Sequence, residues 1–234
     1  MAPRPEQPTP PPAAPFAPGE DRSRWAASFY AFVRPGGSRP GLAGGGELGG
    51  SQAAARIAYR LNRSGPVRTA LAVRSYAPLH DKGAEVAAGL DWHPWPKVPV
   101  RLSVERRVAL DRAGRSAWSA YGAGGFYMER LDGALVLDGY GQAGVVGARA
   151  RDLFADGAVR AGHRVKLGPV SLAGGAGLWG GAQPGAARLD LGPRLGVTLP
   201  LAGHSFGLAV EGRFRVAGHA RPGSGMALTL GIEL

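Results

Sequence analysis

The residues that could carry chemistry in this chain are few, and they lie in segments that the sequence predicts to be turns. His204 is followed by Ser205, and a histidine beside a serine is one element of a nucleophilic hydrolase. Neighbouring residues at the start of a strand point to opposite faces, which separates the imidazole from the hydroxyl. His219 and the pair His80-Asp81 fall in other predicted loops. We therefore expect solvated turn residues and no catalytic residue, with a barrel hydrolase as the least favoured function.

Metal and phosphate sites are equally weakly indicated. Asp152 and Asp156 are four residues apart in a predicted loop, and two carboxylates at that spacing are weak evidence for a cation site. The chain has no Cys, which excludes a thiolate zinc site and a disulfide framework. The glycine-rich segment 35–50 lacks the Lys-Ser/Thr pair and the following helix of a phosphate-binding loop. The sequence predicts no metal, no cofactor and no enzymatic activity.

The charge is strongly positive but widely spread. Lys and Arg number 28 against 17 Asp and Glu, a formal net charge of +11. A basic balance invites nucleic acid as a partner, yet the arginines alternate along the chain with acids, as in Arg101, Glu105 and Arg107. That pattern favours internal ion pairs over a phosphate-binding groove, and we expect no nucleic-acid partner.

The elements that position these charges are β-strands with two unlike faces. From residue 206 to 216, apolar and charged side chains alternate with a period of two, which is the period of a strand: Phe206, Leu208, Val210, Phe214 and Val216 against Glu211, Arg213 and Arg215. A helical period never holds for ten residues, and Gly interrupts nearly every candidate. The pattern predicts twelve strands, over 24–34, 51–61, 67–79, 84–92, 98–110, 116–128, 134–147, 158–167, 170–179, 187–199, 206–216 and 226–234.

Twelve consecutive strands with short connections form a meander, and closure removes its unpaired edges. We expect an all-β fold: a closed antiparallel up-and-down barrel over residues 24–234, with the last strand paired to the first. Residues 1–23 are rich in Pro and are expected to be a disordered leader or linker, with no apolar region typical of a signal peptide.

Three observations predict that the apolar face points to lipid, as in a bacterial outer-membrane barrel. The segment 206–216, tilted near 45° at ~3.3 Å per residue, covers roughly the 25 Å apolar band of such a barrel. Longer connections, such as 35–50, alternate with shorter ones, such as 62–66, which we assign to the periplasmic side. Aromatic residues of the apolar set fall at the expected periplasmic end and would form a membrane girdle: Trp25, Tyr59, Trp92 and Phe206. The alternative is a soluble barrel or sandwich that binds a ligand, with the faces reversed.

In the membrane arrangement the charged face lines the lumen as a ladder of ion pairs. One residue, Arg106, falls on the apolar set without an explanation. The predicted lumen or pore lining is Arg56, Arg60, Arg68, Arg74, Glu85, Asp91, Arg101, Glu105, Arg107, Asp138, Arg188, Asp190, Arg194, Glu211, Arg213 and Arg215.

Six short segments carry a family resemblance: LGGSQ (48–52), GQAGVV (141–146), DLFADG (152–157), AQPG (182–185), RFRVAG (213–218) and PGSG (222–225). As a set they resemble proteobacterial outer-membrane proteins and, more distantly, the C-terminal barrel of the phage adsorption protein A family. That resemblance covers residues 24–234. It implies an outer-membrane pore, anchor or component of surface polysaccharide export that phage exploit. The partners it implies are outer-membrane lipid and envelope export machinery; the oligomeric state is not predicted.

Overall fold

The computed structural model describes residues 23–36, 42–43, 48, 50–62, 67–95, 98–131, 133–147, 151–201 and 204–234. Residues 1–22 of the predicted leader, and Arg39 and Glu47 of the first long connection, lie outside this set. The described part of the chain contains no helix that is long and apolar enough to cross a membrane. The described residues form twelve strands: β1 (Trp25–Val33), β2 (Gln52–Arg60), β3 (Arg68–Pro78), β4 (Glu85–His93), β5 (Val100–Ala109), β6 (Ala117–Arg130), β7 (Leu135–Val146), β8 (Asp152–Leu167), β9 (Val170–Gln183), β10 (Ala186–Leu201), β11 (His204–Gly218) and β12 (Gly225–Glu233).

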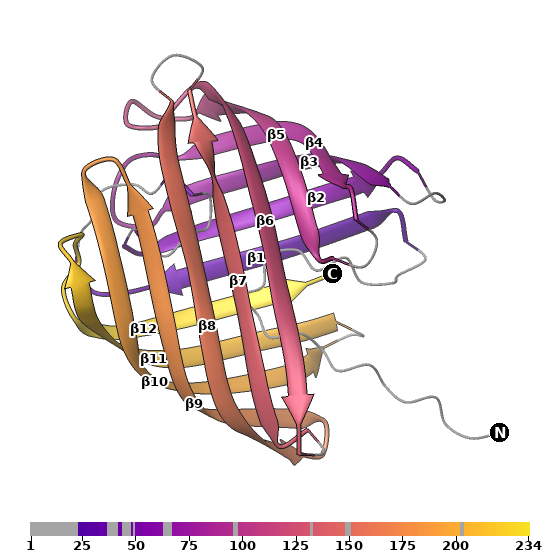
Figure 1. The fold of residues 1–234 in the computed structure, drawn as a ribbon, viewed down its shortest axis with the longest axis vertical. Helices are drawn as coiled ribbons and strands as arrows, with labels where there is room; N and C mark the ends of the chain where they lie inside the picture. Colours follow the sequence, from indigo (N-terminus) through magenta and orange to yellow (C-terminus); the bar gives the residue numbers. More distant parts are fainter. Residues whose placement is uncertain are drawn as a thin grey trace.

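The strands form one closed antiparallel ring, in which each strand pairs with its neighbours in sequence and β12 pairs with β1 (Figure 1). The closing register runs from Ser28 opposite Glu233 to Val33 opposite Leu228. Backbone hydrogen bonds from Ala27 N to Leu234 O (3.0 Å) and from Leu234 N to Ala27 O (2.8 Å) extend it. The predicted twelve-strand barrel, closed by its last and first strands, is confirmed.

The barrel has two unlike ends and an uneven wall. β1 begins and β12 ends at one end, here called the short-turn end, where the connections are 61–67, 94–99, 131–134, 168–169 and 202–203. The opposite, long-loop end carries 34–51, 79–84, 110–116, 147–151, 184–185 and 219–224. Strands β12 and β1 to β5 are 9 to 11 residues long, whereas β6 to β11 are 12 to 16. In Figure 1 the strands of the near wall cross those of the far wall steeply, as strands tilted to the barrel axis do on opposite walls.

Several strand boundaries correct the sequence prediction; β9, for example, continues past residue 179 to Gln183. The segment 148–157 was expected to be a loop, but β8 begins at Asp152. Its inward positions include the apolar Phe154 and the charged Asp156, and its outward positions include Ala155 and Gly157, so the two faces look alike in sequence. The predicted turn at 200–204 is also shorter, because β10 continues to Leu201 and His204 already begins β11.

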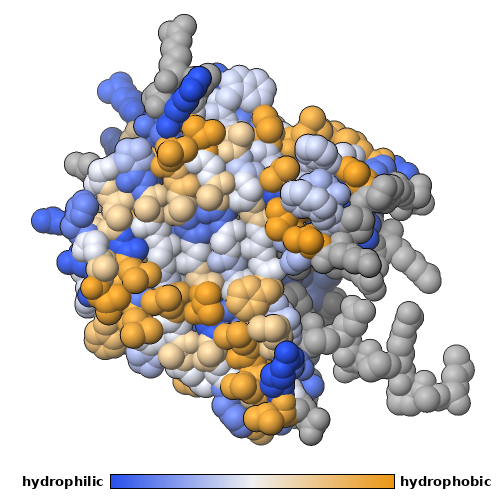
Figure 2. All heavy atoms as spheres, viewed as in Figure 1, coloured by the Kyte–Doolittle hydropathy of each residue, from blue (hydrophilic) through white to orange (hydrophobic). Residues whose placement is uncertain are grey.

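The barrel exposes its apolar side chains and buries its charges. Ile57, Val104 and Phe214 are each more than half exposed, whereas Arg107 and Glu211 are each 1% exposed. The visible face is mostly apolar or of intermediate hydropathy, and hydrophilic residues protrude at its upper and left margins (Figure 2). A belt of apolar side chains is suited to contact with the acyl chains of a bilayer. Closure of the ring also pairs every strand edge, so the strand backbones need no hydrogen-bond partner from lipid. The protein is a transmembrane β-barrel of the bacterial outer-membrane type, and the soluble alternative with an apolar interior is wrong.

One turn residue gives the fold a defined pH dependence. The Asp111 carboxylate accepts hydrogen bonds from the backbone N–H groups of Gly83, Ala84, Ala113 and Gly114 at 2.8–3.0 Å, which ties the β3–β4 connection to the β5–β6 connection. These bonds, led by that from Gly83, lower the pKa of Asp111 to about 2.

Because the folded pKa lies below the unfolded value of ~3.9, Asp111 stabilises the fold above pH ~4, and this contribution disappears as the pH falls toward 2. We expect Asp111→Ala to lower the urea midpoint of unfolding at pH 7, with a difference from the parent that shrinks between pH 4 and 2. Arg112→Gln, in the same turn, is the control. A difference that is the same at pH 7 and pH 2.5 would contradict this role for the carboxylate.

Candidate functional site: the charged interior

The structure places all sixteen predicted lining residues on the inward-facing alternation of their strands. Arg60, Arg194 and Arg215 are half-buried, and Arg68 is exposed at the short-turn end of β3. The remaining twelve are buried: Arg56, Arg74, Glu85, Asp91, Arg101, Glu105, Arg107, Asp138, Arg188, Asp190, Glu211 and Arg213. Their side chains form ion pairs around most of the ring, and the way they pair decides whether the interior can conduct.

On β2, β4 and β5, Asp91 is the centre of one group. Its carboxylate forms an ion pair with Arg56 and lies 3.7 Å from the Nε of Arg101. Ser103 Oγ donates to Asp91 Oδ1 at 2.7 Å and accepts from Arg101 Nε at 3.0 Å. The Arg101 guanidinium also lies 5.8 Å from the ring centroid of Tyr121. One carboxylate therefore holds two arginines from different strands.

Glu105 and Glu85 hold two further arginines in the same part of the wall. Arg74 pairs with Glu105, which also accepts a hydrogen bond from Ser119 Oγ at 2.9 Å. Arg107 binds Glu85 with its Nε at 2.7 Å and its Nη2 at 2.5 Å. Arg56 and Arg74 stand directly opposite each other on β2 and β3. Like charges at such a position are destabilising unless carboxylates intervene, and here each arginine has its own acid.

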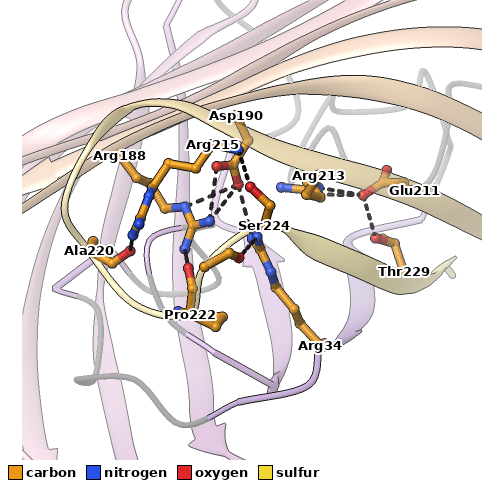
Figure 3. A network of polar contacts seen from close by, with 11 residues as sticks. Arg34, Arg188, Asp190, Glu211, Arg213, Arg215, Ala220, Pro222, Ser224 and Thr229 are labelled. Atoms are coloured by element: carbon orange, nitrogen blue, oxygen red, sulfur yellow. Dashed lines mark hydrogen bonds and ion pairs between the residues drawn. The ribbon is translucent and has the colours of Figure 1, made fainter.

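On the opposite wall, Glu211 and Asp190 are each shared by two arginines. Figure 3 shows Asp190 with Arg34 and Arg188, and Glu211 with Arg213. Glu211 pairs with Arg213 and lies 3.2 Å from Arg194 Nε, and Thr229 Oγ1 donates to it at 3.3 Å. Asp190 lies 2.8 Å from Arg188 Nη2 and 2.9 Å from Arg34 Nη1.

Arg213 also connects three strands through its flat guanidinium. Its Cζ lies 4.0 Å from the ring centroid of Trp179 on β9 and 5.0 Å from that of Phe32 on β1. All three side chains are at most 1% exposed. A guanidinium against aromatic faces is favourable when water is excluded. The stack therefore packs the interior between β9, β11 and β1.

At the long-loop end, described loop segments fold against this interior. Three arginine side chains donate to backbone carbonyls of the 219–224 connection: Arg34 to Gly223, Arg188 to Pro222 and Arg215 to Ala220, at 2.5–3.1 Å. From the 34–51 connection, the Leu42 carbonyl accepts from Arg107 Nη1 at 2.8 Å. Ala43 packs against Val146 and Phe154, and Leu48 is 6% exposed. These contacts pack the described parts of both connections against the interior at the long-loop end.

Sequence reasoning missed several interior residues. Arg160 pairs with Asp138, which stands directly opposite it across β7 and β8. Tyr140 donates to Asp156 at 2.9 Å. The signal for Arg160 was present, since Arg160, Arg164 and Lys166 alternate with Val159 and Val165. No sequence pattern indicates that Arg34, one residue beyond β1, reaches Asp190 on β10.

The predicted girdle residues all lie on outward-facing positions at the short-turn end. Trp25 and Tyr59 are cross-strand partners with ring centroids 4.8 Å apart, Trp92 is 48% exposed, and Phe206 is half-buried. Their girdle role stays a prediction. Arg106, unexplained by the sequence, is exposed near the long-loop end of β5, with its guanidinium 5.9 Å from the Trp118 ring. A long cationic side chain at that height can reach the headgroup region.

The candidates for chemistry stay apart. His204 is exposed, and Ser205 faces inward at the start of β11. Asp152 forms an ion pair with Arg115, whereas Asp156 is bound by Tyr140, so the two carboxylates have separate partners. Within the described part of the chain, no three His, Cys, Asp or Glu side chains gather in a way that could hold a metal ion.

Comparisons with known proteins return the general architecture alone. No family model matches the chain, and no curated protein matches it. An outer membrane channel from Pseudomonas putida F1 is similar at a TM-score of 0.46 and 12% identity, with 100% of this chain and 98% of that chain covered. LpxR from Salmonella typhimurium is similar at a TM-score of 0.46 and 11% identity, with 89% of this chain and 99% of that chain covered. The β domain of the Bordetella autotransporter BrkA is similar at a TM-score of 0.41 and 13% identity, with 89% of this chain and 97% of that chain covered. At these values no functional argument rests on the likeness.

Proposed function

We propose that the protein is a non-enzymatic outer-membrane barrel that is closed at its long-loop end and acts as an anchored component of the cell envelope, and not as a permanently open pore. The observation that carries this proposal is the packing of the interior. Arg107, Arg213, Glu211 and Trp179 are each 1% exposed, although they point into the ring. A conducting channel needs a continuous wet path, and side chains this buried leave no room for one at their level.

The charge balance supports the same conclusion. Among the described residues, the buried charged side chains are eight arginines and seven carboxylates. Taking so many charges out of water is costly, and the cost is offset only where each charge meets an opposite one. Removal of one partner leaves a buried charge uncompensated. A nearly neutral, mutually paired interior is therefore suited to holding two walls together, whereas an ion-selective lining needs charges that a solute can reach.

The orientation and the cellular role are part of the proposal. We place the short-turn end in the periplasm, because short turns face that compartment in outer-membrane barrels. Of the segments that resemble the phage adsorption protein A family, the described residues of 48–52 and 222–225 then lie at the outer end of the barrel. This supports a role beside envelope export machinery for surface polysaccharide, with the closed outer end as a surface that phage could adsorb to.

Planar-bilayer recording tests the closed state. We expect the full chain, refolded in detergent and inserted into a bilayer, to give no stable conductance steps at 100 mV in 1 M KCl. Insertion is checked by slower or faster gel migration without boiling, which reports a folded barrel. Steady, ohmic conductance from samples that pass this check would overturn the closed state and favour the pore.

A further inference from the structure

The short-turn end of the lumen contains a recess that no interaction described above fills. Inward-facing residues of β8, β9 and β10 stand in rows across the three strands. Lys166, Ser171 and Thr198 form the row nearest the end of the barrel. Arg164, Ala173 and Gly196 form the next row, and Gly162, Gly175 and Arg194 the third.

Small side chains make the floor of this recess and cations stand at its corners. Ala173 on β9 lies between Arg164 on β8 and Gly196 on β10, the strand that also carries Arg194, and these residues line a cavity of about 70 Å³. A Cβ added to Gly196 would lie 2.9 Å from Arg194 Nη1, so the absence of a side chain there gives this guanidinium its position. Tyr127, Val136 and Asp138 complete the wall on the side of β6 and β7.

Several hydrogen-bond donors around the recess have no partner among the described residues. Arg164 binds Glu129 and Tyr127 through Nη1 at 2.6 and 2.8 Å, but its buried Nε and Nη2 bind nothing there. The buried hydroxyl of Ser171 is also without a partner. Arg194 uses Nε on Glu211 at 3.2 Å, and the structure records no hydrogen bond from its Nη atoms to a described residue. Buried donors without partners are costly, and a ligand that accepts from them removes that cost.

The charge around the recess favours an anion. Asp138 contributes little repulsion because Arg160 binds it with Nε at 2.6 Å. Glu129 is held by Arg164, and Glu211 is shared by two arginines. The charged side chains that line the cavity itself are two cations and one carboxylate, Arg164 and Arg194 against Asp138.

The recess is accessible from the short-turn end. Lys166 is exposed, and Ser171 and Thr198 are half-buried. We propose that it binds a phosphate or carboxylate group of a solute that enters the lumen from this end, between the guanidinium groups of Arg164 and Arg194 and against the Ser171 hydroxyl. Its size admits a single anionic group, so the remainder of a larger solute would extend toward the mouth. The proposal rests on the barrel architecture and not on closure of the opposite end.

Calorimetric titration of the refolded full chain with inorganic phosphate, and separately with acetate, tests the site. We expect saturable binding of at least one of the two anions and no binding of glucose. Arg194→Gln and Arg164→Gln should each weaken that binding about tenfold or more, because each removes a charge-assisted hydrogen bond. Ser171→Glu leaves every described ion pair in place and should abolish binding by placing a carboxylate at the mouth.

Arg68→Gln is the matched control, because Arg68 is an inward-facing arginine at the same end on β3, away from the recess. Phosphate preferred over acetate would identify a phosphate-bearing solute, and the reverse preference a carboxylate. Lack of binding of both anions by the parent protein, or equal binding by the parent and Ser171→Glu, would overturn the proposal. Bilayer conductance does not enter this test, so its result is separate from that of the closed state.

Discussion

Glu211→Gln is expected to lower the free energy of unfolding by about 3–5 kcal/mol, the range for breaking a buried ion pair from one side. Glu211 is 1% exposed and holds both Arg194 and Arg213, so the neutral amide leaves two guanidinium groups without their carboxylate. Thr229 on β12 also loses the charge that strengthens its hydrogen bond. Urea unfolding of the refolded barrel in lipid vesicles, followed by tryptophan fluorescence, measures the change.

Glu233→Gln is the matched control for this substitution. Glu233 faces inward on the neighbouring strand β12, is half-buried, and has no ion pair recorded among the described residues. The same chemical change there should alter the free energy of unfolding by less than about 1 kcal/mol. Equal effects of the two substitutions on the free energy of unfolding would contradict a special role for the ion pairs of Glu211. A Glu211→Gln/Arg213→Gln double variant should cost less than the sum of the singles, because the two side chains interact directly.

Leu48→Asp is expected to release the 34–51 connection from the lumen and to open the barrel. Leu48 is 6% exposed and packs over Gly181, where its Cβ and the Asp156 Oδ1 both lie within 3.3 Å of the position a Gly181 Cβ would take. A carboxylate at position 48 would therefore be buried beside that of Asp156. Burying an added carboxylate next to an existing one costs several kcal/mol, more than one leucine contributes by packing.

The opening can be measured because the chain has no Cys. A single cysteine at Ser119, which is 3% exposed in the interior near the long-loop end of β6, reports access to water-soluble maleimide. We expect Leu48→Asp to raise the labelling rate roughly tenfold or more, which corresponds to ~1.4 kcal/mol, and to produce conductance steps. Leu131→Asp adds the same charge at an exposed turn of the short-turn end and should do neither. Unchanged labelling in Leu48→Asp would show that this connection does not close the lumen.

The strands could be predicted where their two faces differ in chemistry. In β11, apolar outward residues alternate with Glu211, Arg213 and Arg215, so the period of two is visible without any structure. In β8 the inward set includes Phe154 and the outward set includes Gly157, and the start of the strand was missed. Alternation reports the contrast between faces, and it fails where an apolar residue packs inside the ring.

The partners of the interior charges could not be predicted in the same way. Local pairs, such as Asp138 with Arg160, follow from cross-strand register. Distant pairs, such as Arg34 with Asp190, depend on closure of the ring and on how far a long side chain reaches across it, which no local pattern encodes. The inward packing of Ala43 and Leu48 was missed as well, because a glycine-rich connection carries no sequence signal for where its apolar residues pack. The recess could be predicted only if the register of β8, β9 and β10 were already known.

The uneven height of the wall has a consequence for the surrounding lipid. At ~3.3 Å per residue and a tilt near 45°, a nine-residue strand such as β1 or β12 spans ~21 Å, and a sixteen-residue strand such as β8 spans ~37 Å. Hydrophobic mismatch therefore differs around the circumference, and acyl chains must shorten beside β12 and β1 to β5. The first and last strands meet within this thin sector. A neighbouring envelope protein that prefers a compressed bilayer would gather on that side of the barrel, without any specific contact to attract it.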